Sequence, residues 1–166
     1  MIVEKNRVVT FVYELKLQNV DGESIQQVEK SRPMKIVAGR GALLEPFEKR
    51  LFGLRKGDRF NFTLLSEETF GPYKPKAIIR LQKSVFIEEG SLQPADLVVG
   101  NYIPMETEEG TPFNGKIIEV SEESVVVDFN HPLAGKDLHF SGEILEVKEA
   151  SDKEIILGKA DYSVIK

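Results

Sequence analysis

The residue types in this chain exclude thiol chemistry, and no other set of catalytic residues is evident from their spacing. Among its 166 residues there is no cysteine, so thiol nucleophiles, disulfides and thiolate zinc sites are excluded. The two histidines, His131 and His139, have no acidic partner at helical spacing, and His139 is expected on the exposed face of a strand. No pairing of a nucleophile with a base is evident. The sequence therefore predicts no metal site and no cofactor.

Two further sets of residues fit turns better than binding sites. Gly39-Arg40-Gly41 lacks the strand–helix context and the downstream acid of a dinucleotide site. The acidic residues Glu106, Glu108 and Glu109, like the pair Glu122-Glu123, fall where hairpin turns are predicted, and such turns are commonly acidic because water solvates them. We therefore predict neither phosphate binding nor calcium binding at these positions.

The charge and hydropathy of the chain argue against two classes of partner. The formal net charge is −5 and no run of Lys and Arg stands out, whereas binding to nucleic acid needs clustered cations. No apolar run approaches the roughly 20 residues that a membrane span needs. The segment Met1–Arg7 contains no apolar stretch typical of a signal peptide. We expect a cytoplasmic protein that binds neither nucleic acid nor membranes.

Alternating apolar residues predict the long strands that would position any site. Apolar side chains at every second position from Val9 to Leu17 are typical of a strand with one apolar face, and Asp21-Gly22 predicts the turn after it. Further strands are predicted at Met34–Val37, Arg59–Leu65 and Leu138–Lys148.

One helix is predicted, over Leu43–Phe52, because leucine and phenylalanine side chains recur there at helical spacing. Pro46 suits the first turn, where its missing N–H costs least, and Gly53 suits the carboxyl end.

The region after Phe70 differs in composition from the part before it, with two prolines close together and several short predicted elements. Pro75–Lys83 is expected as a short helix or loop, and the tail Ala150–Lys166 as a short helix or a partly disordered segment. Hairpin turns are predicted at 107–110 and 121–123. Short strands are predicted at Val85–Phe86, Val98–Val99, Tyr102–Glu106, Gly115–Val120 and Ser124–Asp128. By themselves these patterns indicate only a β-rich protein with one principal helix.

The segment from Val125 to Phe140 is the most informative in the chain. Three valines typical of a strand lead into a polar turn ending at Pro132, and Leu133-Ala134-Gly135 then opens an alternating segment. This string resembles the segment with which SlyD-type FKBP peptidyl-prolyl isomerases re-enter their catalytic domain, and the resemblance covers most of the chain. It implies an α+β fold, mainly antiparallel β, in which an FKBP-like half-barrel sheet wraps on one helix.

The same resemblance implies a discontinuous catalytic domain, because in that family a small chaperone domain replaces a short flap. We therefore expect a catalytic domain from residues 1–72 and 127–150, an inserted β-rich chaperone domain at 73–126, and a tail at 151–166. Many SlyD relatives carry a His-rich, metal-binding tail. This tail has no His, so nickel handling is not expected here.

The reaction implied is rotation about an X-Pro peptide bond, which needs neither proton transfer nor a covalent step. Its barrier of about 20 kcal/mol reflects the loss of amide resonance, and an apolar cleft favours the twisted, less charge-separated amide. Matching to the family residue by residue places its catalytic positions at Tyr13, Gln26, Leu44, Phe47, Phe70 and Phe140. The same matching places its substrate-binding wall at Ile25, Met34, Ile36, Leu43 and Leu133.

Two of these positions depart from the family pattern. An ungapped match puts Gln26 where relatives usually carry an aspartate; a slip of one residue gives Gln27, and a larger shift would bring in Glu29. Phe70-Gly71 stands where the family has Tyr-Gly, so the hydroxyl that binds a carbonyl is lost, at a cost of about 1 kcal/mol. We expect a weakened isomerase with poor affinity for the macrolide inhibitors of the family.

The resemblance also implies that the inserted domain binds unfolded or partly folded, proline-containing polypeptides through an exposed apolar groove. The alternative is a non-catalytic holdase that keeps the FKBP fold, and any single residue of such a groove is more commonly core than surface. We expect a monomer. The groove candidates are Ile78, Ile79, Leu81, Val85, Phe86, Leu92, Val98, Val99, Tyr102 and Ile103.

Overall fold

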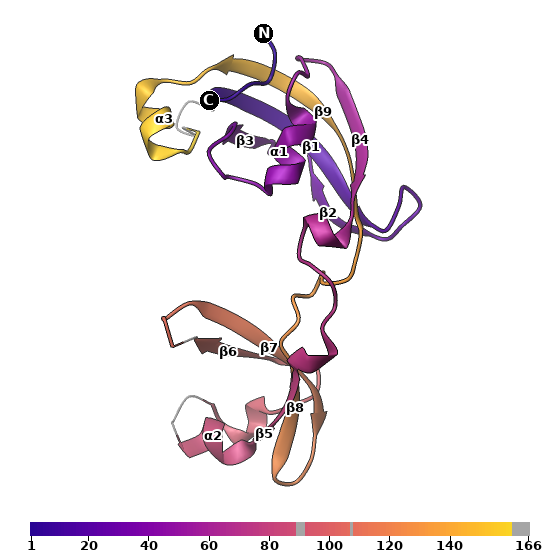
Figure 1. Cartoon of the computed structure of the whole chain (residues 1–166), viewed down its shortest axis with the longest axis vertical. Helices are drawn as coiled ribbons and strands as arrows, with labels where there is room; N and C mark the ends of the chain where they lie inside the picture. Colours follow the sequence, from indigo (N-terminus) through magenta and orange to yellow (C-terminus); the bar gives the residue numbers. More distant parts are fainter. Residues whose placement is uncertain (89–91, 107, 161–166) are drawn as a thin grey trace. The chain divides into compact units, whose positions relative to one another are not determined.

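The computed structural model describes residues 1–88, 92–106 and 108–160 (Figure 1). The chain forms two compact units: unit 1 comprises Met1–Gly71 and Gly135–Lys166, and unit 2 comprises Pro72–Ala134. The chain returns to unit 1 at Gly135 rather than at residue 127, because β8 (Ser124–Asp128) pairs within unit 2. The N–H of Gly135 donates to the carbonyl of Gly71 at 2.8 Å, so the two ends that flank the insertion are neighbours.

Unit 1 is built on an antiparallel sheet with the order β2-β1-β9-β4, in which β3 also pairs with β1. The longest pairing joins β1 to β9 along the whole of β1, so β9 is a central strand although it comes last in sequence. The strands are β1 (Arg7–Leu17), β2 (Ser24–Val28), β3 (Met34–Val37), β4 (Arg59–Leu64) and β9 (Leu138–Glu149).

The sheet of unit 1 curves around one short helix, α1 (Glu45–Leu51) (Figure 1). Pro46 lies in its first turn as predicted, and Gly53, just past its end, has a φ of 88°, a conformation that glycine adopts without strain. Phe47 and Leu51 are buried against the sheet. A 3-10 turn, η1 (Ser66–Glu68), follows β4. The predicted α+β class is therefore confirmed.

The tail forms the short helix α3 (Asp152–Leu157). Ser151 caps it by accepting a hydrogen bond from the N–H of Glu154, whose carboxylate accepts in turn from the N–H of Ser151. Beyond the helix, Ala160 packs against Val8 and Val37. The described part of the tail is thus ordered against unit 1; the part of the tail prediction that concerns 161–166 lies outside the described residues.

Unit 2 is a second antiparallel sheet with the order β5-β8-β7-β6. Its core contains five aliphatic side chains and one aromatic ring, namely Leu97, Ile103, Ile117, Val125, Val127 and Phe86. Its elements are η2 (Pro75–Ala77), β5 (Ile78–Gln82), α2 (Lys83–Glu88), η3 (Pro94–Asp96), β6 (Tyr102–Glu106), β7 (Pro112–Val120) and β8.

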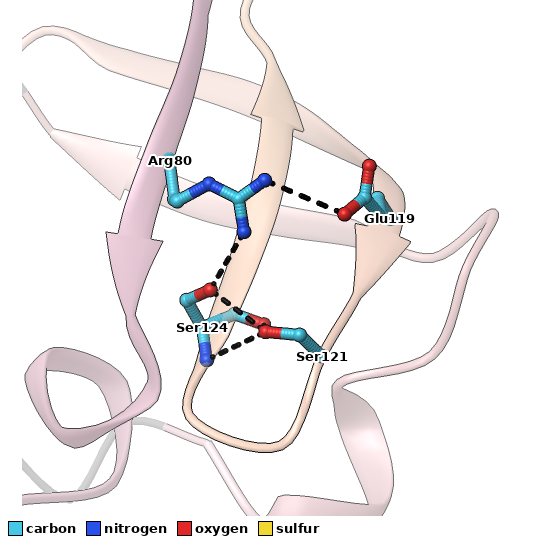
Figure 2. Close-up of polar contacts among 4 residues, drawn as sticks. All are labelled: Arg80, Glu119, Ser121 and Ser124. Carbon is cyan, nitrogen blue, oxygen red and sulfur yellow. Dashed lines mark hydrogen bonds and ion pairs between the residues drawn. The ribbon is translucent and has the colours of Figure 1, made fainter.

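A network of polar contacts links the β7–β8 hairpin to β5 (Figure 2). The Arg80 guanidinium donates to Ser124 Oγ at 3.0 Å and to Glu119 at 3.4 Å. Ser121 Oγ lies 2.8 Å from Ser124 Oγ and accepts a hydrogen bond from the N–H of Ser124 at 3.2 Å. These contacts fix the strand register across three strands of unit 2.

Several predicted elements differ from the structure, each for a local reason. Val85 and Phe86 lie in the helix α2 rather than in a strand, and Phe86 faces the core. Val98 and Val99 lie in a turn, since the N–H of Asn101 bonds back to the carbonyl of Val98.

Strand β2 was not predicted because Ser24–Val28 has no apolar alternation; its pairing with β1 makes it a strand. The segment predicted as a helix or loop at Pro75–Lys83 contains strand β5. His139 is buried, not exposed, and its Nδ1 lies 2.9 Å from the Thr63 hydroxyl. The predicted turn at 107–110 includes Thr107, which lies outside the described residues. Along the described chain, none of the helices has both the length and the apolar content to span a bilayer.

Candidate active site

Aromatic side chains gather on the inner face of unit 1, where α1 packs on the sheet. The ring of Phe47 lies at the centre, with centroid distances of 4.7 Å to Phe140, 5.5 Å to Phe62, 5.9 Å to Tyr13 and 6.1 Å to Phe60. Most of these contacts are edge-on or tilted, the geometry that aromatic quadrupoles favour. We call this set, together with Phe11 at 5.9 Å from Phe47, the aromatic floor.

Strand pairing explains why these rings share one face. Residues directly opposite in an antiparallel pair point to the same side, and Phe140 stands opposite both Leu15 and Phe62. Gly142 stands opposite both Tyr13 and Phe60. A Cβ at Gly142 would lie 2.5 Å from the Phe60 ring and 2.1 Å from a backbone carbonyl, so only glycine lets the Phe60 ring lie there.

Most of the aromatic floor is buried, with Phe47 3%, Phe140 6% and Tyr13 8% exposed, whereas Phe62 is half-buried. Burial raises the pKa of the Tyr13 phenol, so the ring remains neutral well above neutral pH. Within the described residues the Tyr13 hydroxyl makes no hydrogen bond, and it is not among the fully buried polar atoms without a partner. It is therefore a polar group without a protein partner among the described residues, in a largely apolar surrounding.

The loop before α1 carries a backbone donor three residues before Phe47, the central ring of the floor. Leu44 is the N-cap of α1, and its carbonyl accepts from the N–H groups of Phe47 and Glu48 at 3.0 and 3.1 Å. The N–H of Leu43 donates to the buried Glu48 carboxylate, whereas the next N–H, that of Leu44, has no partner within the described chain. The half-buried Leu43 and Leu44 thus differ: one amide is engaged and the other is free to bind a carbonyl.

The other predicted site residues of unit 1 lie at different depths. Met34 pairs with Phe11 and Ile36 with Val9, which puts both on the inner face, Ile36 buried and Met34 half-buried. Gln26 pairs with Leu15 and is exposed on the same face, whereas Gln27 pairs with Glu14 on the opposite face.

Of the remaining predicted positions, two are partly exposed residues of unit 1 and one belongs to unit 2. Ile25 sits at a register shift of β2 and is 38% exposed. Phe70 is 37% exposed and lies in unit 1 beyond η1. Leu133 is half-buried and belongs to unit 2, so it is placed independently of the aromatic floor.

The predicted groove of unit 2 divides into surface and core. Ile79, Val85, Val98, Val99 and Tyr102 are each 44–59% exposed. Ile78 is half-buried on β5. Phe86 and Ile103 lie in the core at 5% and 2% exposure, so they pack beneath the exposed apolar residues and are not part of the groove surface. Leu81 and Leu92 pack partly against the same core, and a hollow of about 530 Å³ opens between α2 and β6, lined by Val85, Leu92, Met105 and Pro112 among others.

Four residues of the unit 1 site were not identified by the sequence analysis. Phe60 and Phe62 alternate within a predicted strand, and that spacing alone places them on one face. Glu48 and Gly142 leave no such pattern, because each is required by backbone groups distant in sequence. Within the described chain, no three His, Asp or Glu side chains lie close enough together to hold a metal ion.

Comparison with known proteins agrees with this geometry. Residues 2–104 match the family described as FKBP-type peptidyl-prolyl cis-trans isomerase. The FKBP-type peptidyl-prolyl cis-trans isomerase SlyD of Haemophilus influenzae is 35% identical over 158 residues, which cover 95% of this chain and 79% of that protein. The SlyD proteins of Yersinia pestis and Escherichia coli K12 are 34% and 32% identical, covering 93% and 95% of this chain and 75% and 76% of their own lengths. The chain therefore belongs to the FKBP-type peptidyl-prolyl cis-trans isomerases, and the resemblance to their SlyD members is confirmed.

Proposed function

We propose that this chain isomerises X-Pro bonds in unfolded or partly folded polypeptides, and that the reaction takes place over the aromatic floor of unit 1. The observation that carries the proposal is the packing of Tyr13, Phe140 and their neighbours around Phe47. A proline ring has no N–H and a wholly apolar body, so a closed aromatic surface is the surface it fits.

The chemistry requires an environment rather than a reactive group. A planar amide is more charge-separated than the twisted amide of the transition state, so an apolar surface destabilises the first relative to the second. The free N–H of Leu44 supports the proposal because it offers a fixed donor to a carbonyl next to the proline. The Tyr13 hydroxyl offers a second polar contact at the edge of the floor.

The rate is expected to be lower than that of relatives with the full set of polar groups. Gln26 lies on the inner face but carries no charge, and Phe70 brings no hydroxyl. Each missing neutral hydrogen bond reduces the rate several-fold, at about 1 kcal/mol. The aromatic floor remains, so catalysis is reduced and not abolished.

Unit 2 is proposed to hold the unfolded chain. Its exposed apolar side chains, among them Val98, Val99 and Tyr102, exceed what a small sheet needs for its own core. A bound client raises the effective concentration of its prolines at unit 1, because both units belong to one chain.

A second function, a holdase without useful catalysis, is favoured by the two departures at Gln26 and Phe70. Refolding of a denatured protein limited by a prolyl bond distinguishes the two, with this chain added in catalytic amounts. Acceleration supports the isomerase. Suppressed aggregation without acceleration supports the holdase and overturns the catalytic proposal.

A further inference from the structure

Glu48 is a buried acid next to the central ring of the aromatic floor, and its carboxylate binds the loop before α1. It is 5% exposed. One oxygen accepts from the N–H of Gly39 at 2.7 Å and the other from the N–H of Leu43 at 3.3 Å. Hydrogen bonds to a charged acceptor are about twice as strong as neutral ones, and burial strengthens them further.

The loop that this carboxylate bridges is irregular and contains two glycines. Gly39 and Gly41 have φ values of 74° and 73°, which other residues rarely adopt, so glycine is needed here and the loop loses much entropy on folding. Arg40 is held from outside by its Nε, which donates to Asn6 at 2.9 Å. Glu48 is the group that fixes both ends of the loop, at positions four residues apart.

The geometry of the neighbouring amide follows from this bridge. Because the N–H of Leu43 is directed at Glu48, the orientation of the Leu43–Leu44 segment is set on one side. On the other side, the carbonyl of Leu44 accepts from the first turn of α1. The free N–H of Leu44 lies between these two fixed points, and its direction is therefore defined before any ligand arrives.

We propose that Glu48 is a positioning residue for prolyl isomerisation: its carboxylate holds the Gly39–Leu43 loop so that the N–H of Leu44 meets the substrate carbonyl. The proposal rests on the proposed isomerase function. Both carboxylate oxygens of Glu48 are engaged by backbone N–H groups of the loop, so Glu48 acts through the backbone. Pre-aligned donors act in the transition state without reorganisation, so a loosened loop lowers the rate even when the protein remains folded.

Three full-length variants test this role. Glu48→Ala removes both hydrogen bonds, Glu48→Gln keeps an amide oxygen for one of them, and Glu45→Gln makes the same change at an exposed position of the same helix. The readouts are kcat/KM on a short X-Pro peptide and NMR hydrogen exchange of the Gly39 and Leu43 amides. Both are measured at a temperature where the spectrum shows every variant to be folded.

We expect kcat/KM to fall about tenfold in Glu48→Ala and about threefold in Glu48→Gln, the size of effect that follows from slight misplacement of a donor. Exchange at Gly39 and Leu43 rises in the same order, while the Phe11 amide in β1 and the Glu45→Gln control are unchanged. A purely structural role would lower the melting temperature and leave kcat/KM of the folded protein unaltered.

The outcomes separate this proposal from the function on which it rests. An active wild type with equally active, folded Glu48 variants overturns the role of Glu48 and leaves the isomerase standing. If Glu48→Ala does not fold, Glu48→Gln decides by the same two readouts. A wild type at the background rate overturns the isomerase function and the role of Glu48 with it.

Discussion

The cores of the two units differ in the kind of side chain that fills them. Unit 1 buries phenylalanine rings around Phe47, and their edge-on contacts fix each ring against the next. Unit 2 buries mainly aliphatic side chains. Among its described residues Phe86 is the one fully buried ring, Phe129 packs partly against the core, and apolar side chains such as Val99 and Tyr102 remain on the surface.

This difference fits the two roles proposed above for the units. Interlocked rings make a surface of defined shape, which suits one small apolar target, the proline ring. An aliphatic sheet with exposed Val and Tyr side chains makes a surface of broad specificity, which suits unfolded chains of many sequences. The comparison leads to four predictions, given from the largest expected effect to the smallest.

Removing the central ring of either core is expected to unfold mainly its own unit. Phe47→Ala should destabilise unit 1 by about 3–5 kcal/mol, because the buried ring leaves a cavity, and Phe86→Ala should do the same in unit 2. Hydrogen exchange followed by mass spectrometry reports on the two units separately. The matched control is Phe52→Ala, which truncates a ring that is 40% exposed. Equal acceleration of exchange in both units by either variant would contradict the independence of the cores.

Making the surface of unit 2 polar is expected to affect proteins and spare peptides. The triple change Val98→Ser, Val99→Ser and Tyr102→Ser should slow catalysed refolding of a protein by about tenfold, since the local concentration of client is lost. The rate on a short X-Pro peptide should remain unchanged. Ile156→Ser, at a position in unit 1 that is 83% exposed, serves as the control. Parallel losses on peptide and protein would reject these two separate roles.

Restoring the missing polar groups in unit 1 should raise the rate. Gln26→Asp with Phe70→Tyr is expected to increase kcat/KM on a peptide by about five- to tenfold, because the two hydrogen bonds gained contribute about 1 kcal/mol together when each is at the lower end of the usual range. Gln27→Asp makes the same change on the same strand but on the opposite face, and it should have no such effect. A gain as large from Gln27→Asp would show that the face of β2 is irrelevant.

The smallest effect concerns alkaline pH. Burial disfavours the phenolate of Tyr13 and raises its pKa, so the folded state retains a proton that the unfolded state releases. The stabilisation is complete below the unfolded pKa of about 10 and is lost as pH rises through the folded pKa. The free energy of unfolding of unit 1, measured by denaturant titration above about pH 10, should therefore fall less steeply with pH in Tyr13→Phe than in the wild type. Identical slopes would count against a buried, neutral Tyr13.

The fold was predictable where one face of an element is apolar. The alternation from Val9 to Leu17 and the spacing of Phe47 and Leu51 predict β1 and α1 because burial of that face decides the structure. Ser24–Val28 was missed since its backbone pairing with β1, which no side-chain pattern encodes, makes it a strand. Val85-Phe86 looked like a strand because both residues favour strands, but the burial of Phe86 against the sheet is satisfied by a helix.

The candidate site was predictable in its apolar part and not in its polar part. Tyr13, Phe47 and Phe140 were identified through a family resemblance, and the structure brings their rings together. The role of Glu48 depends on backbone N–H groups at Gly39 and Leu43. Every residue except proline has such a group, so the residue types do not show which ones Glu48 will bind. His139 was expected on the surface because alternation places it on the other face of the strand from Phe140. In the structure His139 is buried on that face as well.

The place of β9 in the sheet sets an order in which the nascent chain acquires structure on the ribosome. Strand β1 pairs with β2 and β3, but its longest pairing and the pairing of β4 both need β9, which is complete only at residue 149. The strands of unit 2 are contiguous in sequence and are complete by residue 128. All the strands of unit 2 are therefore synthesised before the central strand of unit 1. We expect unit 2, which is proposed to bind unfolded chains, to fold while part of its own chain is still unfolded.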